Sequence, residues 1–136
     1  MNDDIYKSAG IIIRGGKLLV ERSTGKTAFI SPGGSIEAGE TAKQALVREL
    51  EEEFDIEVKE SDLEEFGSFE APASGQEHRT VYMQVFIVKR FKGQPKPSSE
   101  VEEIAWITSK NEQNLEIGSI FEHEVIPLLK TQRRIS

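Results

Sequence analysis

Short runs of apolar and β-branched residues, separated by turn-forming residues, characterise the start of the chain. Ala9 to Arg14 and Leu18 to Glu21 are two such runs, and the turn-like tetrapeptide Arg14-Gly15-Gly16-Lys17 joins them. Two strand-like runs separated by such a turn predict a β-hairpin. The later segment Ser31 to Ser35 contains one proline and two glycines, so we expect a loop whose backbone larger residues could not easily follow.

After residue 40 the spacing of apolar residues becomes helical. Apolar residues recur at helical spacing between residues 42 and 54, and Thr41 in front of them is suited to cap a helix. At about 100° per residue, the large apolar side chains fall on one arc. Glu49, Glu52 and Glu53 fall on the adjoining arc. The sequence therefore predicts a helix with an apolar face beside a carboxylate face.

The remainder of the chain predicts three more strands, two loops and a closing helix. Pro127 lies within the closing helix, where its missing N–H predicts a break or a late start. No internal repeat or linker is visible, so we expect residues 1–136 to form a single domain in which a mixed β-sheet packs between helices. The expected strands are Leu63 to Glu70, Arg79 to Arg90 and Val101 to Ile107, the expected loops are Ala71 to Glu77 and Gly93 to Ser99, and the closing helix covers Ile120 to Lys130.

Composition and charge narrow the choice of partners. The chain has 136 residues, enough for one domain with a real core, and 24 acidic against 17 basic residues give a net charge of −7. A nucleic acid polymer is therefore not expected as a partner. A small anion stays compatible, because bound cations and nearby basic side chains can override the net charge at one cleft.

Two absences in the sequence set further limits. There is no cysteine, which excludes disulfides, zinc–thiolate sites and thiol nucleophiles and leaves hard-metal or acid–base chemistry. The segment Met1-Asn2-Asp3-Asp4 is acidic, unlike the basic start of a signal peptide, and the apolar runs are too short to span a bilayer. We therefore expect a cytoplasmic protein with no membrane partner.

The carboxylate face has two interpretations. Glu49 and Glu53 are like charges four residues apart with Glu52 between them, an arrangement that costs about 0.2–0.5 kcal/mol per pair on an isolated helix. A divalent cation would offset this cost, since carboxylates are hard oxygen ligands suited to Mg²⁺, which also binds substrate phosphates and activates water. The alternative is a solvated acidic face, the commoner origin of a glutamate run taken alone.

The residues around the glutamates favour the metal site. Gly34, Glu40 and the segment Arg48 to Ile56 follow the spacing G-x5-E-x7-R-E-U-x-E-E-x-G-U, in which U is aliphatic. This spacing resembles the Nudix box, with Asp55 in place of the last glycine. That glycine lies at a helix end where a left-handed backbone is often needed, a conformation that Asp tolerates better than most residues. The chain is similar to small MutT-like and ADP-ribose-pyrophosphatase-like members of the Nudix hydrolase superfamily.

The resemblance implies a fold and a reaction. The fold would be of the α+β class, an α/β/α sandwich with a mixed β-sheet between helices. The reaction would be a pyrophosphohydrolysis that needs Mg²⁺, with Mn²⁺ as a substitute, in which water attacks phosphorus in a nucleoside diphosphate linked to another group. A nucleoside triphosphate, normal or oxidised, or a nucleotide sugar of the ADP-ribose type would be the small-molecule partner of a monomer or homodimer. A catalytically silent nucleotide-binding regulatory module with the same fold is the alternative.

The resemblance also assigns roles to residues of the box. Arg48 would orient the carboxylates, in reach of an i,i+4 ion pair with Glu52, and Glu40 would support the junction of loop and helix. Glu49 and Glu52 are catalytic candidates, and the general base stays open between Glu49 and a residue outside the box. The metal ligands would be Glu49, Glu52, Glu53 and the backbone carbonyl of Gly34.

Three further candidates lie outside the box. Glu100 stands where MutT-like enzymes bring a further glutamate to the metal site, with Glu102 and Glu103 as close competitors and a solvated loop residue as the alternative. Arg22, at the end of the second strand, is a candidate for contact with a phosphate or base, and an ordinary exposed arginine is its alternative. Arg79, near the start of a later strand, is a candidate to line the substrate cleft.

Overall fold

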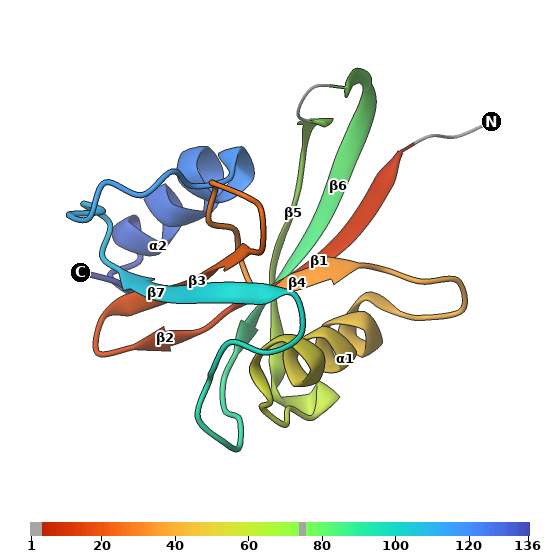
Figure 1. Cartoon of the computed structure of the whole chain (residues 1–136), viewed down its shortest axis with the longest axis horizontal. Coiled ribbons are helices and arrows are strands. Elements are labelled where there is room, and N and C mark those ends of the chain that lie inside the picture. The colour runs from red at the N-terminus through yellow and green to blue at the C-terminus, as the bar shows by residue number, and fades with distance from the viewer. Residues whose placement is uncertain (1–3, 74–75) are drawn as a thin grey trace.

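The computed structural model describes residues 4–73 and 76–136 of the chain, which form two sheets and two α-helices (Figure 1). No helix among these residues is long and apolar enough to cross a membrane. The strands are β1 (Ile5–Ile11), β2 (Ile13–Arg14), β3 (Lys17–Ser23), β4 (Gly33–Ser35), β5 (Leu63–Ala73), β6 (Gln76–Val88) and β7 (Val101–Ile107). The helices are α1 (Ala42–Phe54), the 3₁₀ turn η1 (Glu60–Asp62), the π-helical turn η2 (Phe121–Val125) and α2 (Ile126–Thr131).

One of the two sheets is mixed and the other is antiparallel. The four-stranded sheet has the order β4-β1-β6-β5, in which β1 is parallel to β6 and the other pairs are antiparallel. The three-stranded sheet has the order β2-β3-β7, with both pairs antiparallel. The mixed sheet expected from the sequence is therefore present, and a second sheet accompanies it.

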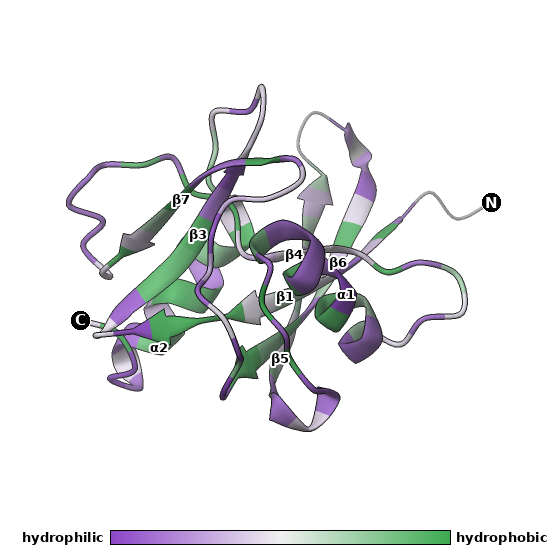
Figure 2. Cartoon of the chain, turned by 60° about the horizontal axis from the view of Figure 1, so that its bottom comes forward, coloured by the Kyte–Doolittle hydropathy of each residue, from purple (hydrophilic) through white to green (hydrophobic). Residues whose placement is uncertain are grey.

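The two helices pack on opposite faces of the sheets (Figure 1), and Figure 2 shows hydrophobic stretches along the strands. Successive side chains of a strand point to opposite faces. Leu19 of β3 accordingly joins the buried cluster around Leu50 of α1, whereas Leu18 and Val20 join the cluster around Leu129 of α2. This arrangement confirms the expected α/β/α sandwich.

The predicted hairpin is only partly present, because the first predicted strand divides between two sheets. Ala9 lies in β1, which pairs with β6, and only Ile13 and Arg14 pair with β3. Between the two parts, Ile12 is buried, and its carbonyl oxygen accepts a hydrogen bond from the Leu19 amide at 2.9 Å. The chain therefore passes from one sheet to the other at Ile12, a choice of partner strand that a local pattern does not specify.

Of two proline-containing segments, the first differs from expectation and the second agrees with it. The predicted loop at residues 71–77 is shorter, because β5 continues through Pro72 to Ala73 and β6 begins at Gln76, while residues 74 and 75 lie outside the described part. Pro72 is compatible with a strand because β5 is at the edge of its sheet. At the other end of the chain, α2 starts late, as predicted: Pro127 lies in its first turn, directly after η2.

Candidate active site

Helix α1 carries the carboxylates and is fixed at its start and along one face. Thr41 Oγ1 accepts a hydrogen bond from the Gln44 amide at 3.1 Å, and Gln44 Oε1 accepts one from the Thr41 amide at 3.0 Å. This capping box satisfies two N–H groups at the helix start. Four side chains of the inner face are fully buried, which fixes the rotation of the helix and turns the adjoining carboxylate face toward β4. They are Ala45, Leu46, Leu50 and Phe54.

Two glycines of β4 make direct room for two of the carboxylates. A Cβ atom on Gly34 would lie 2.7 Å from the Cδ atom of Glu49, so the Glu49 carboxylate rests against bare backbone. Gly33 has a φ of 134°, which favours glycine, and its amide donates a hydrogen bond to Glu53 Oε1 at 3.1 Å. The segment expected to be a loop at Ser31 to Ser35 thus contains the short strand β4, and β4 and the helix specify each other's positions.

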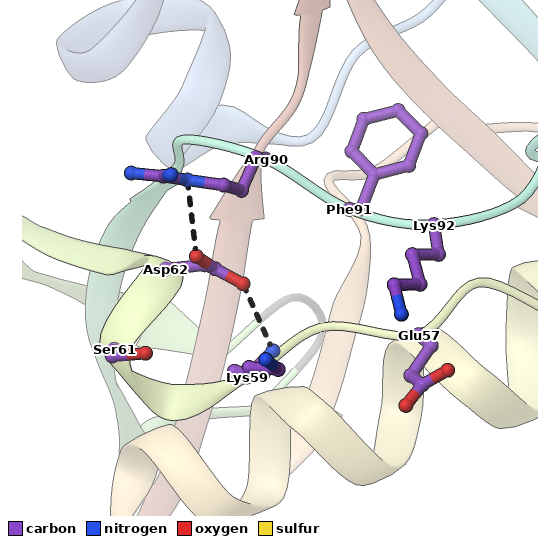
Figure 3. Close-up of a pocket in the computed structure, with 7 residues that line it drawn as sticks. All are labelled: Glu57, Lys59, Ser61, Asp62, Arg90, Phe91 and Lys92. Carbon is purple, nitrogen blue, oxygen red and sulfur yellow. Dashed lines mark hydrogen bonds and ion pairs between the residues drawn. The ribbon is translucent and has the colours of Figure 1, made fainter.

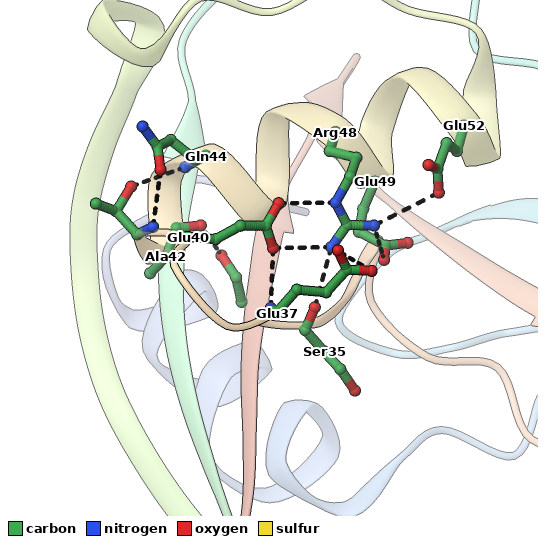
Figure 4. Close-up of polar contacts among 10 residues, drawn as sticks. Ser35, Glu37, Glu40, Ala42, Gln44, Arg48, Glu49 and Glu52 are labelled. Carbon is green, nitrogen blue, oxygen red and sulfur yellow. Dashed lines mark hydrogen bonds and ion pairs between the residues drawn. The ribbon is translucent and has the colours of Figure 1, made fainter.

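Arg48 holds the loop and the carboxylate face together (Figure 4). Its Nε and Nη2 atoms donate to the two carboxylate oxygens of Glu40 at 2.8 and 3.0 Å, and its Nη1 donates to Glu49 Oε1 at 2.9 Å. Nη2 also donates to the Ser35 carbonyl at 3.2 Å, and Nη1 lies 3.6 Å from Glu52 Oε2. The i,i+4 contact expected between Arg48 and Glu52 is present, and the geometry fits an orienting role for Arg48.

Burial distinguishes the three box carboxylates from one another. The Glu52 side chain is 55% exposed and that of Glu49 is 17% exposed. Burial raises the pKa of Glu49 above its ordinary value despite the hydrogen bond from Arg48, and burial also raises the pKa of Glu53. Glu49 and Glu53 thus lie in a partly desolvated environment while Glu52 faces solvent.

Glu21 of β3 is a site residue that the sequence analysis did not identify. Its side chain is fully buried and lies within hydrogen-bonding reach of the Glu53 carboxylate. Burial, followed by repulsion from Glu53 and Glu49, raises the pKa of Glu21 strongly. The sequence did contain an indication of its burial: side chains of a strand alternate between faces, which places Glu21 on the same face as the buried Leu19.

The donors present fit a hard divalent cation. They are carboxylate oxygens beside the backbone of a glycine loop, the ligand type that Mg²⁺ takes in proteins. Within residues 4–73 and 76–136, no three acidic or histidine side chains close around one point by themselves. Two observations nevertheless indicate that the site suits a cation. Gly34 leaves space that the Glu49 carboxylate fills, and the buried carboxylate oxygens of Glu21 have no hydrogen-bond donor among the described residues.

An apolar cleft adjoins the carboxylates. Its volume is about 190 Å³, and its lining residue Ser31 is followed by Pro32 and then by Gly33 and Gly34 of β4. Lys7 lines the same cleft, and its positive charge partly offsets the raised pKa of Glu21. The cleft is lined by Lys7, Ile30, Ser31, Ala71, Pro72, Val81, Met83, Gly118, Ser119, Ile120 and Phe121.

A larger hollow of about 460 Å³ contains none of the box carboxylates (Figure 3). Lys59, Arg90 and Lys92 line it, together with Asp62, whose Oδ1 lies 3.2 Å from Arg90 Nε. Because catalytic chemistry needs the reacting groups within contact of the substrate, the smaller cleft beside Glu21 and the glycine loop is the better candidate.

Glu100, the first candidate outside the box, lies on a loop next to α1. Glu100 is held by its backbone, since its carbonyl accepts a hydrogen bond from the Thr24 amide at 2.9 Å, and its side chain is exposed. Its loop reaches α1, where the Ser98 amide donates to the Glu53 carbonyl at 3.0 Å.

The two candidate arginines contact residues of their own surroundings. Arg22 Nη1 lies 2.7 Å from Glu102 Oε2 and Nη2 lies 3.1 Å from Glu103 Oε1, so both competitors of Glu100 face this arginine. Arg79 Nη1 donates to Gln76 Oε1 at 2.8 Å, and Arg79 is not among the residues lining the 190 Å³ cleft. The roles suggested for Glu100, Arg22 and Arg79 stay predictions.

Asp55 has the backbone conformation expected at the position of the box glycine. It ends α1 in the left-handed region with φ 56° and ψ 39°, and its amide donates to the Glu51 carbonyl. Lys96 Nζ lies 3.2 Å from Asp55 Oδ2, which offsets the unfavourable negative charge at a helix C-terminus.

Fold and site together define a domain that can hold a hard cation beside a small apolar cleft, and comparison with known proteins agrees. The NUDIX domain family matches residues 5–129. A protein of Escherichia coli K12 named 8-oxo-dGTP diphosphatase is 42% identical over 64 residues, which span 47% of this chain and 46% of that relative, less than half of its length.

Two further matches cover more of the chain. A protein of Methanocaldococcus jannaschii named ADP-ribose pyrophosphatase is 32% identical over 120 residues, 86% of this chain and 67% of that one. A MutT structure from work on the Aliivibrio salmonicida and Vibrio cholerae proteins superposes with a TM-score of 0.75 and 27% identity, covering 96% of this chain and 99% of the other. This chain belongs to the NUDIX domain family, which confirms the resemblance, and the relatives named here agree with the expected pyrophosphohydrolase class.

Proposed function

We propose that this protein hydrolyses a pyrophosphate bond of a small nucleotide, with Mg²⁺ as cofactor and Mn²⁺ as its substitute. The observation that carries the proposal is that Glu49 packs against Gly34 and Glu53 accepts a hydrogen bond from the Gly33 amide, next to an apolar cleft. Glu49, Glu52, Glu53 and the Gly34 carbonyl would hold the cation. When bound, the cation supplies neutralisation of phosphate charge and lowers the pKa of water at the site.

The residues of the chain supply the rest of the reaction. The oxygen of water forms a bond to phosphorus, the P–O bond of the anhydride breaks, and two phosphate-containing products leave. The proton released by water needs a base, and Glu49 is the favoured acceptor because burial raises its pKa and Arg48 fixes its orientation. Glu100 is the alternative base, on a loop that is tied to α1 through Ser98.

The cleft supports a nucleoside as the non-reacting part of the substrate. Apolar side chains such as Val81 and Met83 offer a surface for a base, and the Ser31 and Ser119 residues add polar groups. Relatives named for 8-oxo-dGTP and for ADP-ribose support two substrate classes, nucleoside triphosphates and nucleotide sugars. Arg22 and Arg79 stay candidates for further substrate contacts, and the cytoplasmic location and the monomeric or homodimeric state stay predictions from the sequence.

A substrate panel with paired variants tests the proposal. Normal and oxidised nucleoside triphosphates and nucleotide sugars are incubated with Mg²⁺, and both products are identified. We expect turnover of at least one compound, its loss on chelation of the metal, and its loss in Glu52→Gln. Glu51→Gln removes the same charge from the opposite, exposed side of α1 and should remain active. Binding of a panel compound without turnover would instead favour the catalytically silent module.

A further inference from the structure

Glu21 has a fixed backbone position, but its buried carboxylate has no hydrogen-bond donor among the described residues. Its backbone pairs with Ile30, through an amide-to-carbonyl bond of 2.8 Å and a returning bond of 2.7 Å. The side chain therefore has a fixed origin, on the face of β3 that Leu19 shares and that packs toward α1. It is 0% exposed, and neither carboxylate oxygen meets a donor anywhere in the described residues.

The groups that face Glu21 are mostly of the same charge. The Glu53 carboxylate of α1 lies within hydrogen-bonding reach, the Glu49 carboxylate is near enough to repel, and Lys7 of β1 is the cation that acts in the opposite sense. Two ionised carboxylates are both acceptors and cannot bond to each other. Arg48 already pairs with Glu49. The single positive charge on Lys7 does not balance the two remaining carboxylates of Glu21 and Glu53, so this pocket of the site requires another positive charge.

A proton or a metal ion could supply that charge, and the surroundings favour a metal ion. The Gly33 amide occupies Glu53 Oε1, which leaves the other oxygen of Glu53 and both oxygens of Glu21 available. A proton would satisfy a single pair of oxygens and leave the rest without partners. A divalent cation accepts several oxygen ligands at once, and additional carboxylates raise the affinity of such a site.

We propose that Glu21 would be a further ligand of the divalent cation, supplied by β3 beside Glu53 of α1. This inference rests on the cation site of the proposed function. It adds a ligand outside the box, on a strand of the three-stranded sheet, to those that α1 would supply. Cation binding should consequently tie β3 to α1.

Three glutamine variants distinguish this inference from its alternatives. Mn²⁺ binding to the full chain is measured by calorimetry and by loss of the free-ion EPR signal, and thermal unfolding is followed in EDTA and in Mn²⁺. For Glu21→Gln we expect Mn²⁺ to bind at least about tenfold more weakly. We also expect a higher melting temperature than wild type in EDTA, because an unpaired buried carboxylate is gone, and a smaller rise on addition of Mn²⁺.

The controls separate the possible failures. Glu64→Gln removes an exposed carboxylate from β5 and should bind Mn²⁺ as wild type does. Unchanged Mn²⁺ affinity and an unchanged Mn²⁺-dependent melting shift in Glu21→Gln, with binding lost in Glu52→Gln, would overturn the role of Glu21 and leave the cation site intact. A Glu21→Gln protein that is less stable than wild type in EDTA would overturn it as well. Absence of Mn²⁺ binding to the wild-type chain would instead refute the proposed cation site.

Discussion

Glu40 receives two parallel hydrogen bonds from Arg48, at 2.8 Å from Nε and 3.0 Å from Nη2, across eight residues of the chain. The Glu37 amide donates to the same carboxylate at 2.9 Å. The pair anchors the loop before α1 and leaves Nη1 of Arg48 free to reach Glu49. The expected support of the loop–helix junction by Glu40 is therefore a paired, charge-assisted contact.

Acid should weaken this anchor in a defined pH window. The hydrogen bonds from Arg48, followed by that from the Glu37 amide, lower the pKa of Glu40 to about 2 from an ordinary value of 4.5. A lowered pKa contributes stability above the ordinary value, and the contribution is lost as pH falls from about 4.5 toward 2. Glu40→Gln should be less stable than wild type at pH 7, and the difference in urea unfolding free energy should shrink below pH 4. Parallel curves would contradict this.

Gly34→Ala should remove activity without unfolding the protein. The added Cβ would meet the Glu49 carboxylate at 2.7 Å and displace it, and misplacement of a reacting group by about 1 Å costs about 10²-fold in rate. Steady-state kinetics and circular dichroism check the two parts. Gly25→Ala is the contrast: its φ of 82° makes alanine unfavourable by about 1–2 kcal/mol, but open space surrounds it, so activity should persist.

Asp55→Gly should stabilise the protein by about 0.5–1 kcal/mol. Glycine adopts the left-handed conformation at φ 56° without a Cβ penalty, and the ion pair that it removes is weak because the side chains of Lys96 and Asp55 are 65% and 61% exposed. Asp55→Ala, which keeps the Cβ atom and loses the ion pair, should be less stable than wild type. Chemical unfolding of both variants measures the effect, and kcat should not change.

Filling the cleft should weaken substrate binding and leave the cation site intact. Val81→Trp places a large ring in the 190 Å³ cleft, so we expect KM to rise at least about tenfold, equivalent to about 1.4 kcal/mol, with unchanged Mn²⁺ affinity. Tyr82→Trp is the matched control on the opposite face of β6, where Tyr82 stacks on Tyr6 with ring centroids 5.4 Å apart. Equal KM in the two variants would exclude this cleft as the nucleoside site.

The sequence predicts best those features that depend on neighbours along the chain. The helix from Ala42 to Phe54, its Thr41 cap and the left-handed Asp55 follow from helical spacing and local backbone preference, and all three are present. The strand Val101–Ile107 was likewise predictable from its own composition.

Features that depend on residues distant in the chain were harder to predict from the sequence. β1 pairs with β6, so that Ile5 lies beside Val81, and no local pattern distinguishes this pairing from a hairpin with β3. Glu21 looked like the polar end of a strand, and its importance arises only because α1 places Glu53 against it. Lys7 gained its position on the cleft in the same way, through the packing of β1 against β6 and β4.

The separation between the cleft and the carboxylate helix has an evolutionary consequence. The cleft is lined by residues of β1, β5 and β6, by residues 30 and 31 and by residues 118–121, none of which lies in α1. Under the proposed function, substitutions there would exchange one nucleobase or sugar for another while the proposed catalytic residues stay the same. Divergence of substrate preference at a constant reaction is the change that this architecture makes easiest.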